Sequence, residues 1–139
     1  KIIFLILIIA GGFVGYYFIY NQPKALVTEK GNVDIIKVFT PKENQEIFSP
    51  LVIEGEARGN WFFEASFPIV LTDWDGKIIA QHYAEAQGEW MTENFVLFSS
   101  KLIFEKPAYG SRGFLILKRD NPSGLSEHDD SVEIPIIFR

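Results

Sequence analysis

The hydrophobic positions of this chain change their period once, near residue 34. Ile2–Tyr20 is an apolar run without a charged residue, whereas the sequence from Ile35 onward alternates apolar and polar positions. A helix over the first run would be roughly 28 Å long, which is about the thickness of the hydrocarbon core of a bilayer. Alternation with a period of two is typical of strands that bury one face. The pattern therefore predicts a transmembrane helix over residues 1–20, a linker over 21–33 and a β-domain over 34–139.

Tyrosines gather at the far end of the apolar run, at Tyr16, Tyr17 and Tyr20. Tyrosine is enriched at membrane–water interfaces, so these rings, together with Ile2 at the other end, are predicted to anchor the helix in lipid. A cleaved secretory signal and a buried core helix remain alternatives. A signal has a shorter apolar stretch and small residues at its cleavage site, which the segment 23–25 does not supply. Lysine lies on both sides of the run, so the flanking charges barely discriminate the orientation.

The alternating part predicts about seven strands separated by turn residues. Leu51–Arg58 illustrates the pattern, because its odd-numbered positions are apolar or small and its even-numbered positions are mostly charged. Phe114–Leu117 is apolar at every position, as expected of a central strand. The last strand is predicted to point four side chains inward, Val132, Ile134, Ile136 and Phe138. These patterns predict an all-β fold, an immunoglobulin-like antiparallel β-sandwich.

Two local irregularities are predicted within the strands. Pro68 lies in an otherwise alternating strand, which indicates an edge position or a bulge. In Phe95–Phe104 the apolar parity changes between Leu97 and Leu102, which predicts a bulge near Ser99–Lys101.

Turn chemistry and a tryptophan give two further predictions. Asp75-Gly76 predicts a type I′ hairpin turn, since both central positions of that turn need positive φ. Trp90 is predicted to fill the core at the place where an antibody domain has its disulfide, because the chain has no cysteine.

Composition excludes several classes of function. The net charge is −5 and the isoelectric point about 5.0, so the chain offers no basic field for a phosphate backbone, and no nucleic-acid partner is expected. The absence of cysteine excludes a disulfide framework, a thiolate metal site and a cysteine nucleophile. The part beyond the linker has the size of one domain with a single core.

The alternating region resembles a known bacterial domain family. The residues that carry the resemblance are Pro41, then Ser49-Pro50-Leu51-Val52-Ile53 with Gly55 and Ala57, and Phe63-Glu64. They are similar to the opening motif of the immunoglobulin-like domain that is linked by name to spore germination and sporulation, the second of the "Gmad" domains. Asp75-Gly76, Gly88 with Trp90 and Phe95, Leu102–Phe104, and the loop Asn121-Pro122-Ser123-Gly124 before Val132–Ile137 continue the resemblance. It implies an extracytoplasmic, non-enzymatic module, usually behind a signal or an anchor, and it brings no catalytic residues.

Candidate chemistry outside the resemblance has simpler explanations. His82 and Glu85 are three residues apart in a strand, so they point to opposite faces. Asp73-Trp74-Asp75-Gly76 begins like a calcium loop but lacks the later ligands, and a hairpin turn explains it. Glu127-His128-Asp129-Asp130, with Asp120 and Asn121 at the other end of the polar loop, could gather oxygens around calcium, but a solvated loop is the default interpretation. We expect no catalytic residue, metal or cofactor, and the chain is predicted not to be an enzyme.

Aromatic residues are the candidate contact residues for a partner. Trp61 and Phe62 follow a break at Gly59-Asn60, and Trp74 lies at a hairpin tip. If they are exposed, these rings could stack on a sugar or anchor a protein. The alternative is that they fill the end of the sandwich.

The sequence therefore predicts a membrane-anchored extracytoplasmic module that acts in interaction or structure at the bacterial cell envelope. Its expected partners are membrane lipid, through the N-terminal helix, and an envelope protein or polysaccharide. The alternative function is a carbohydrate-binding module that uses exposed aromatics around Trp61 and Trp74.

Overall fold

The structure is a computed structural model that describes residues 35–139. The predicted anchor, with its contact residues Ile2, Tyr16, Tyr17 and Tyr20, lies outside the described residues, as does the linker, so both stay predictions. Among residues 35–139, no helix is long and apolar enough to cross a membrane.

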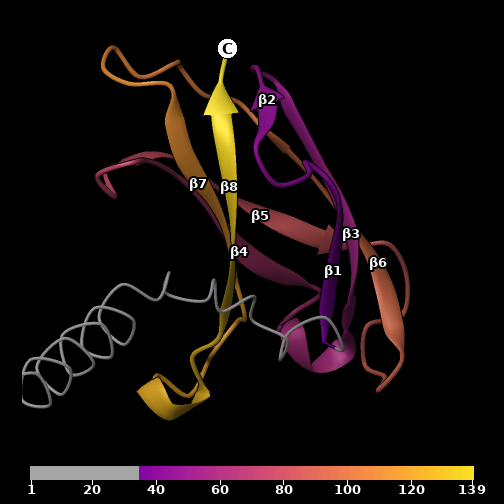
Figure 1. Cartoon of the computed structure of the whole chain (residues 1–139). Coiled ribbons are helices and arrows are strands. Elements are labelled where there is room, and N and C mark those ends of the chain that lie inside the picture. The colour runs from indigo at the N-terminus through magenta and orange to yellow at the C-terminus, as the bar shows by residue number, and fades with distance from the viewer. Residues whose placement is uncertain (1–34) are drawn as a thin grey trace, which may run out of the picture. The chain divides into compact units, whose positions relative to one another are not determined.

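The described residues form eight strands and two single 3₁₀ turns (Figure 1). In chain order they are β1 (Ile36–Thr40), β2 (Gln45–Ile47), β3 (Leu51–Arg58), η1 (Gly59–Trp61), β4 (Ser66–Asp73), β5 (Ile78–Ala86), β6 (Phe95–Leu102), β7 (Arg112–Lys118), η2 (Ser126–His128) and β8 (Ser131–Phe138). The predicted all-β fold is confirmed. The eighth strand is β2, which has only three residues and therefore no readable alternation.

The strands pair in the order β1-β3-β6-β5-β4-β7-β8-β2. Strands β1, β3 and β6 make one layer, and β5, β4, β7, β8 and β2 make the other (Figure 1). All neighbours are antiparallel except β2 and β8, which are parallel. The two layers are joined at one corner, where the end of β5 pairs with β6 through only two residue pairs. The chain passes from one layer to the other between β1 and β2, because β1 pairs with β3 and β2 pairs with β8.

The core lies between the layers and follows the predicted alternation. Leu51, Ile53 and Ala57 of β3 point inward, and their charged neighbours point outward. In β8, Ile134, Ile136 and Phe138 are buried as predicted, and Val132 is half-buried against the core. Aromatic rings link the layers, since Phe67 of β4 meets Phe98 of β6 edge to face at 4.9 Å between ring centroids. Such pairs favour edge-to-face geometry because of the ring quadrupole.

The bulge predicted near Ser99–Lys101 is wrong. The pairing of β3 with β6 runs without a shift from Leu51↔Leu102 to Arg58↔Phe95. Val96, Phe98, Ser100 and Leu102 all point inward, and Leu97 is exposed. The apparent change of parity arises because a serine occupies a core position. The Ser100 hydroxyl is satisfied there by donating to the Tyr83 carbonyl oxygen at 2.8 Å, so the polar group can be buried.

The predicted β4–β5 hairpin is present, but its turn is not type I′. Only Gly76 has a positive φ, at 82°, and the Gly76 amide donates to the Asp73 carbonyl. The pairing of β4 with β5 shifts its register between Leu71 and Thr72, just before the turn. Pro68 lies in an interior strand, yet β7 pairs with β4 only from Ile69 onward, so the proline has a strand neighbour on one side alone.

The tryptophan that fills the core is Trp61, not Trp90. Trp61 is fully buried, whereas Trp90 is half-buried at the margin of the core. Gly59 allows this arrangement, because a β-carbon there would overlap the carbonyl oxygens of Trp90 and Thr92. The close approach of the two backbones lets η1 turn inward.

The antiparallel order separates the connections into two ends (Figure 1). The β2–β3, β4–β5 and β6–β7 connections share one end with the C-terminus. Ile35, where the described part begins, lies at the opposite end and accepts a hydrogen bond from the Arg58 amide. That end also carries η1 and the β5–β6 and β7–β8 connections.

Candidate functional site

Two of the three predicted contact residues are buried. Trp61 and Phe62 are inside the domain, so the exposure that a contact role requires is absent at both residues. Both rings meet Phe67 edge to face, at 6.4 Å and 5.3 Å between centroids. They close the end of the sandwich that carries Ile35, which is the structural alternative that the sequence also allowed.

Trp74 meets the condition of exposure, with 64% of its surface accessible. It lies in the β4–β5 turn, which the Asp73 carboxylate organises by accepting from the amides of Asp75, at 3.0 Å, and Lys77, at 2.9 Å. A side chain that accepts from nearby backbone amides competes with strand pairing and favours a tight turn. The indole is therefore carried on a turn that is held by its own hydrogen bonds.

The indole of Trp74 lies over Gly110 of the β6–β7 connection. A β-carbon at Gly110 would be 3.1 Å from Cδ1 and 3.3 Å from Nε1 of Trp74, and Gly110 has a φ of 79°. Glycine is needed for both reasons, since other residues rarely adopt this φ and would press on the ring. The neighbouring Tyr109 is 87% exposed. The sequence predicts only a loop over Pro107–Gly113. The position of Tyr109 and Gly110 beside Trp74 depends on a contact between the β4–β5 turn and the β6–β7 connection, which joins the two layers.

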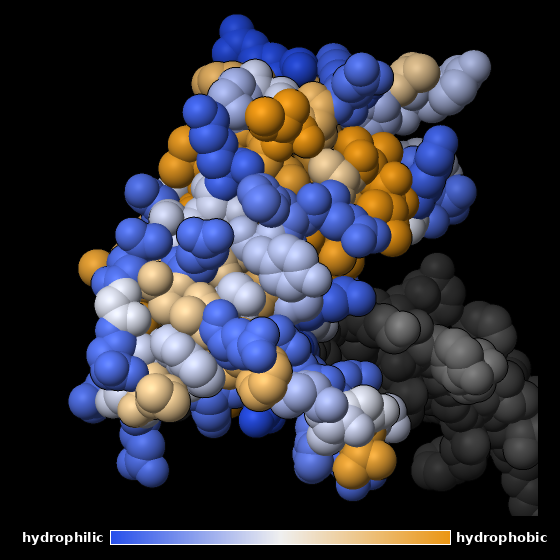
Figure 2. All heavy atoms as spheres, turned by 180° about the vertical axis from the view of Figure 1, so that it is seen from behind, coloured by the Kyte–Doolittle hydropathy of each residue, from blue (hydrophilic) through white to orange (hydrophobic). Residues whose placement is uncertain are grey.

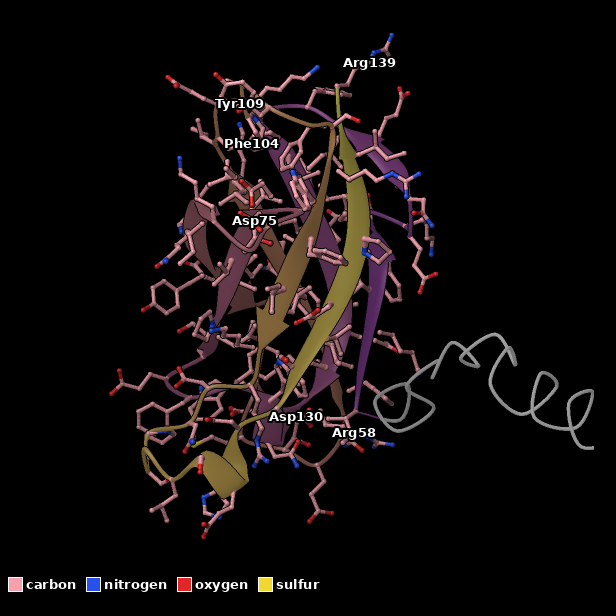
Figure 3. The ribbon with its side chains drawn as sticks, turned by 60° about the vertical axis from the view of Figure 1, so that its left-hand side comes forward. Arg58, Asp75, Phe104, Tyr109, Asp130 and Arg139 are labelled. Carbon is pink, nitrogen blue, oxygen red and sulfur yellow. The ribbon has the colours of Figure 1, made fainter. Side chains whose placement is uncertain are left out.

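Four large apolar side chains of the connections at this end are exposed, and together they form what we call the distal tip: Phe48, Trp74, Ile103 and Tyr109. The connections that carry them are tied together, because the Phe104 amide donates to the Ser49 hydroxyl at 3.1 Å. Phe104 also packs against Phe138 at 5.7 Å. Figure 3 shows Tyr109 and Phe104 near the end that carries Arg139, with Arg58 and Asp130 at the other end. Seen from behind, strongly apolar side chains gather in the upper half of the domain (Figure 2).

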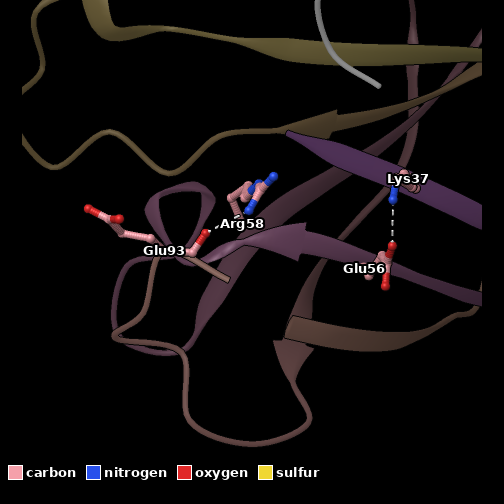
Figure 4. A network of polar contacts seen from close by, with 4 residues as sticks. All are labelled: Lys37, Glu56, Arg58 and Glu93. Carbon is pink, nitrogen blue, oxygen red and sulfur yellow. Dashed lines mark hydrogen bonds and ion pairs between the residues drawn. The ribbon is translucent and has the colours of Figure 1, made fainter. Parts of the chain in front are cut away.

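On the outer face of β1, β3 and β6, charged side chains surround the ring of Phe95. Phe95 has the Lys37 ammonium 4.1 Å and the Arg58 guanidinium 4.2 Å from its ring centroid. Lys37 also pairs with Glu56 at 2.9 Å, and Arg58 donates to the Glu93 carbonyl at 3.1 Å (Figure 4). Exposed pairs of this kind contribute about 1 kcal/mol or less each to stability. We therefore interpret them as contacts that hold the side chains of this face in place, and not as a binding site.

The side chains of the polar loop 121–131 form hydrogen bonds within the loop. The Asn121 amide donates to the Asp129 carboxylate and to the Leu125 carbonyl, each at 2.8 Å. The Ser123 hydroxyl donates to Asn121 Oδ1 and lies 3.0 Å from His128 Nδ1. Within residues 35–139, no group of three or more histidine or acidic side chains is arranged to hold a metal ion. The oxygens proposed for calcium are thus partly engaged inside the loop.

His82 is exposed on β5. It lines an open hollow of about 320 Å³ over β3, β5 and β6, whose lining also includes Tyr83 and Ser99. The sequence gives no sign of this hollow, because it forms where two paired strands separate.

The comparison with protein families gives one match. The model described as "immunoglobulin-like domain of bacterial spore germination" (Gmad2) matches residues 35–126. The match covers β1 through β7 and ends at Ser126, the first residue of η2, before β8. A comparison with curated proteins finds no significant match.

Proposed function

Because this chain belongs to the immunoglobulin-like domain family of bacterial spore germination, we propose that it is a membrane-anchored interaction module of the bacterial cell envelope. Membership of an immunoglobulin-like family suggests a non-catalytic module. The proposal adds an anchor over Ile2–Tyr20, an extracytoplasmic position of the domain and a partner bound at the distal tip.

The observation that carries the proposal is the exposed ring of Trp74. Tryptophan is among the residues that contribute most to binding when a partner covers it, because its large ring has both an apolar body and a polar N–H. The turn hydrogen bonds and the contact with Gly110 hold the ring in place before binding. A side chain that is already ordered loses less conformational entropy on association.

The position of the distal tip within the domain agrees with this role. The chain enters the domain at Ile35, and the tip is at the opposite end. If residues 1–20 span a membrane, a linker of thirteen residues could reach about 40 Å when extended, which separates the domain from the lipid. A domain separated from the lipid in this way could present the tip to the cell wall or to a protein there.

Two alanine variants test the site. Trp74→Ala removes the ring at the tip, and Leu125→Ala removes an exposed apolar side chain at the opposite end. Cross-linking in intact cells should capture an envelope protein or polysaccharide with the parent chain and Leu125→Ala, and much less with Trp74→Ala. Equal capture by the parent chain and both variants would contradict a partner bound at the distal tip.

The anchor is tested separately. A chain that lacks residues 1–33 should stay folded and leave the membrane fraction, and externally added protease should reach the domain of the full chain in spheroplasts. An insoluble product, or a protected domain, would contradict the proposed anchor or orientation.

A carbohydrate-binding module remains the second candidate. The specific observation that favours it is the pair of exposed rings, Trp74 and Tyr109, on adjacent connections at the tip. Sugars stack on such rings through their apolar faces. Binding on a glycan array that disappears in both Trp74→Ala and Tyr109→Ala would support this candidate. Cross-links to proteins alone would support the first.

A further inference from the structure

Strand β5 leaves its neighbour β6 after only two residue pairs. Glu85 lies opposite Ser99 and Ala86 opposite Phe98, and no further pair between these strands occurs in the described part of the chain. Both strands nevertheless continue, since β6 runs on to Leu102 and β5 begins at Ile78. The two layers therefore separate here and leave a seam between two strand edges.

The main-chain groups of Lys101 point into this seam. Successive residues of an antiparallel strand direct their N–H and C=O groups to alternate sides. Leu97 faces β5, because its carbonyl accepts from the Gln87 amide at 2.7 Å, and Ser99 pairs with Glu85. Lys101 is the next residue of the same parity, yet β5 has already left. Its N–H and C=O are free to pair with an added strand, which is a recurrent mode of peptide recognition.

The hollow of about 320 Å³ lies over this seam, and we call it the notch. Its lining residues are Val52, Glu54, His82, Tyr83, Glu85, Ser99, Ser100 and Lys101. Tyr83 is 55% and Val52 47% exposed, so an incoming strand would find apolar surface as well as hydrogen-bonding groups. The bond from the Ser100 hydroxyl to the Tyr83 carbonyl holds the two strands at the point where the notch begins.

The charges of the notch favour a cationic ligand group. Glu54 and Glu85 both lie directly opposite Ser99, one from each side, so the three side chains form a row on one face of the sheet. With cross-strand spacing of about 5 Å, the β-carbons of the two glutamates are about 10 Å apart over the small serine. Neither glutamate forms an ion pair with another described residue. Against these two carboxylates the lining has one ammonium, from Lys101.

We propose that the notch is a strand-addition site, which binds an extended peptide segment of a partner protein through the edge of β6 and takes a basic side chain of that segment between Glu54 and Glu85. This is a second site beside the distal tip, and it rests on the pairing of β5 and β6 and not on Trp74. A second copy of this chain is a poorer occupant, because two β6 edges related by a twofold axis would bring Lys101 close to its own copy.

The test uses the 139-residue chain and a fluorescent octapeptide of alternating threonine and valine with one central lysine. Fluorescence anisotropy should show saturable binding. Methylation of the peptide's amide nitrogens on the edge facing β6 should weaken it about tenfold, because main-chain hydrogen bonds are lost. Replacement of the peptide lysine by glutamate should also weaken it, through repulsion by Glu54 and Glu85.

Variants of the protein separate the backbone from the charges. Lys101→Pro removes the amide that points into the notch and keeps the pairing with β3, so it should weaken binding about fivefold while far-UV circular dichroism stays unchanged. Lys101→Ala keeps the amide and removes a repelling charge, so it should bind the basic peptide at least as tightly. The double variant Glu54→Gln with Glu85→Gln should lose the preference for lysine over glutamate.

Several results would contradict the proposal that the notch is a strand-addition site. These are full binding of the methylated peptide, equal affinity of Lys101→Pro and Lys101→Ala, competition by glycans, or a concentration-dependent dimer that Lys101→Pro abolishes. Absence of peptide binding while Trp74-dependent capture persists would overturn the notch and leave the proposed function standing. The methylated peptide keeps the test decisive even if Lys101→Pro does not fold.

Discussion

Replacement of Trp61 by alanine or phenylalanine separates two contributions to stability, one from its buried apolar surface and one from its buried Nε1–H. The ring is fully buried and meets Phe67 edge to face. Its Nε1–H is also buried and has no hydrogen-bond partner among the described residues. The side chain therefore stabilises the domain through its apolar surface and destabilises it through one unsatisfied donor. Trp61→Ala and Trp61→Phe remove these contributions in different proportions.

The expected magnitudes differ clearly. Trp61→Ala removes almost the whole buried side chain and should lower the free energy of unfolding by about 3–5 kcal/mol. Trp61→Phe removes about 40 Å² of apolar surface, worth about 1 kcal/mol, and also removes a buried donor that costs about 1–3 kcal/mol. The two effects nearly cancel, so we expect Trp61→Phe to lie within about 1 kcal/mol of the parent chain.

Urea denaturation followed by circular dichroism measures both variants. With an m-value of about 1–2 kcal/mol/M, the alanine variant should shift the midpoint down by about 1.5–5 M, and the phenylalanine variant by less than about 1 M, with m unchanged. A loss of more than 3 kcal/mol for Trp61→Phe would refute the reasoning, since it would mean that the indole N–H is satisfied. A loss below 1 kcal/mol for Trp61→Ala would refute the burial itself.

Three further predictions concern glycine and the polar loop. Gly55→Ala should cost about 2 kcal/mol or more in urea denaturation, because the new β-carbon would lie 2.5 Å from Cζ of Phe98 inside the core. Gly110→Ala should cost about 1–2 kcal/mol through its positive φ and should also shift the fluorescence emission of Trp74, whose ring must move. Millimolar calcium should leave the melting temperature unchanged, because the Asp129 carboxylate already accepts a hydrogen bond from the Asn121 amide inside the loop 121–131.

Gly76→Ala is the matched control for the two glycine variants. It has a φ of 82° and no atom within 4 Å of a new β-carbon, so it measures the backbone cost alone. A Gly55→Ala chain as stable as Gly76→Ala would contradict the packing argument, and an unchanged tryptophan spectrum in Gly110→Ala would contradict the contact with Trp74. A rise of several degrees in melting temperature with calcium would restore the proposed metal site.

Alternation predicted most of the fold, because a strand with one buried face has a period that can be read directly. The inward faces of β3 and β8 follow it residue by residue. It failed at Ser100, where a hydroxyl with a long-range partner occupies a core position. It also missed β2, whose three residues pair with a strand about ninety positions away.

The candidate site was less predictable, since it depends on contacts between segments. The sequence placed Trp74 at an exposed turn correctly, because turn residues surround it. It could not tell that Trp61 turns inward, which depends on the close approach of Gly59 to the segment 90–92. The notch has no signature at all, because nothing in the alternation of β5 and β6 shows where their pairing ends.

Site-specific photo-cross-linking in living cells tests the central claim most directly. A photoreactive amino acid replaces Phe48 at the distal tip in one chain, which keeps Trp74, and Leu125 at the opposite end in a second chain; both positions are exposed. We predict that position 48 captures one discrete envelope protein or polysaccharide and that position 125 does not. Capture at position 125 alone, or identical non-specific products at both positions, would contradict a partner at the distal tip.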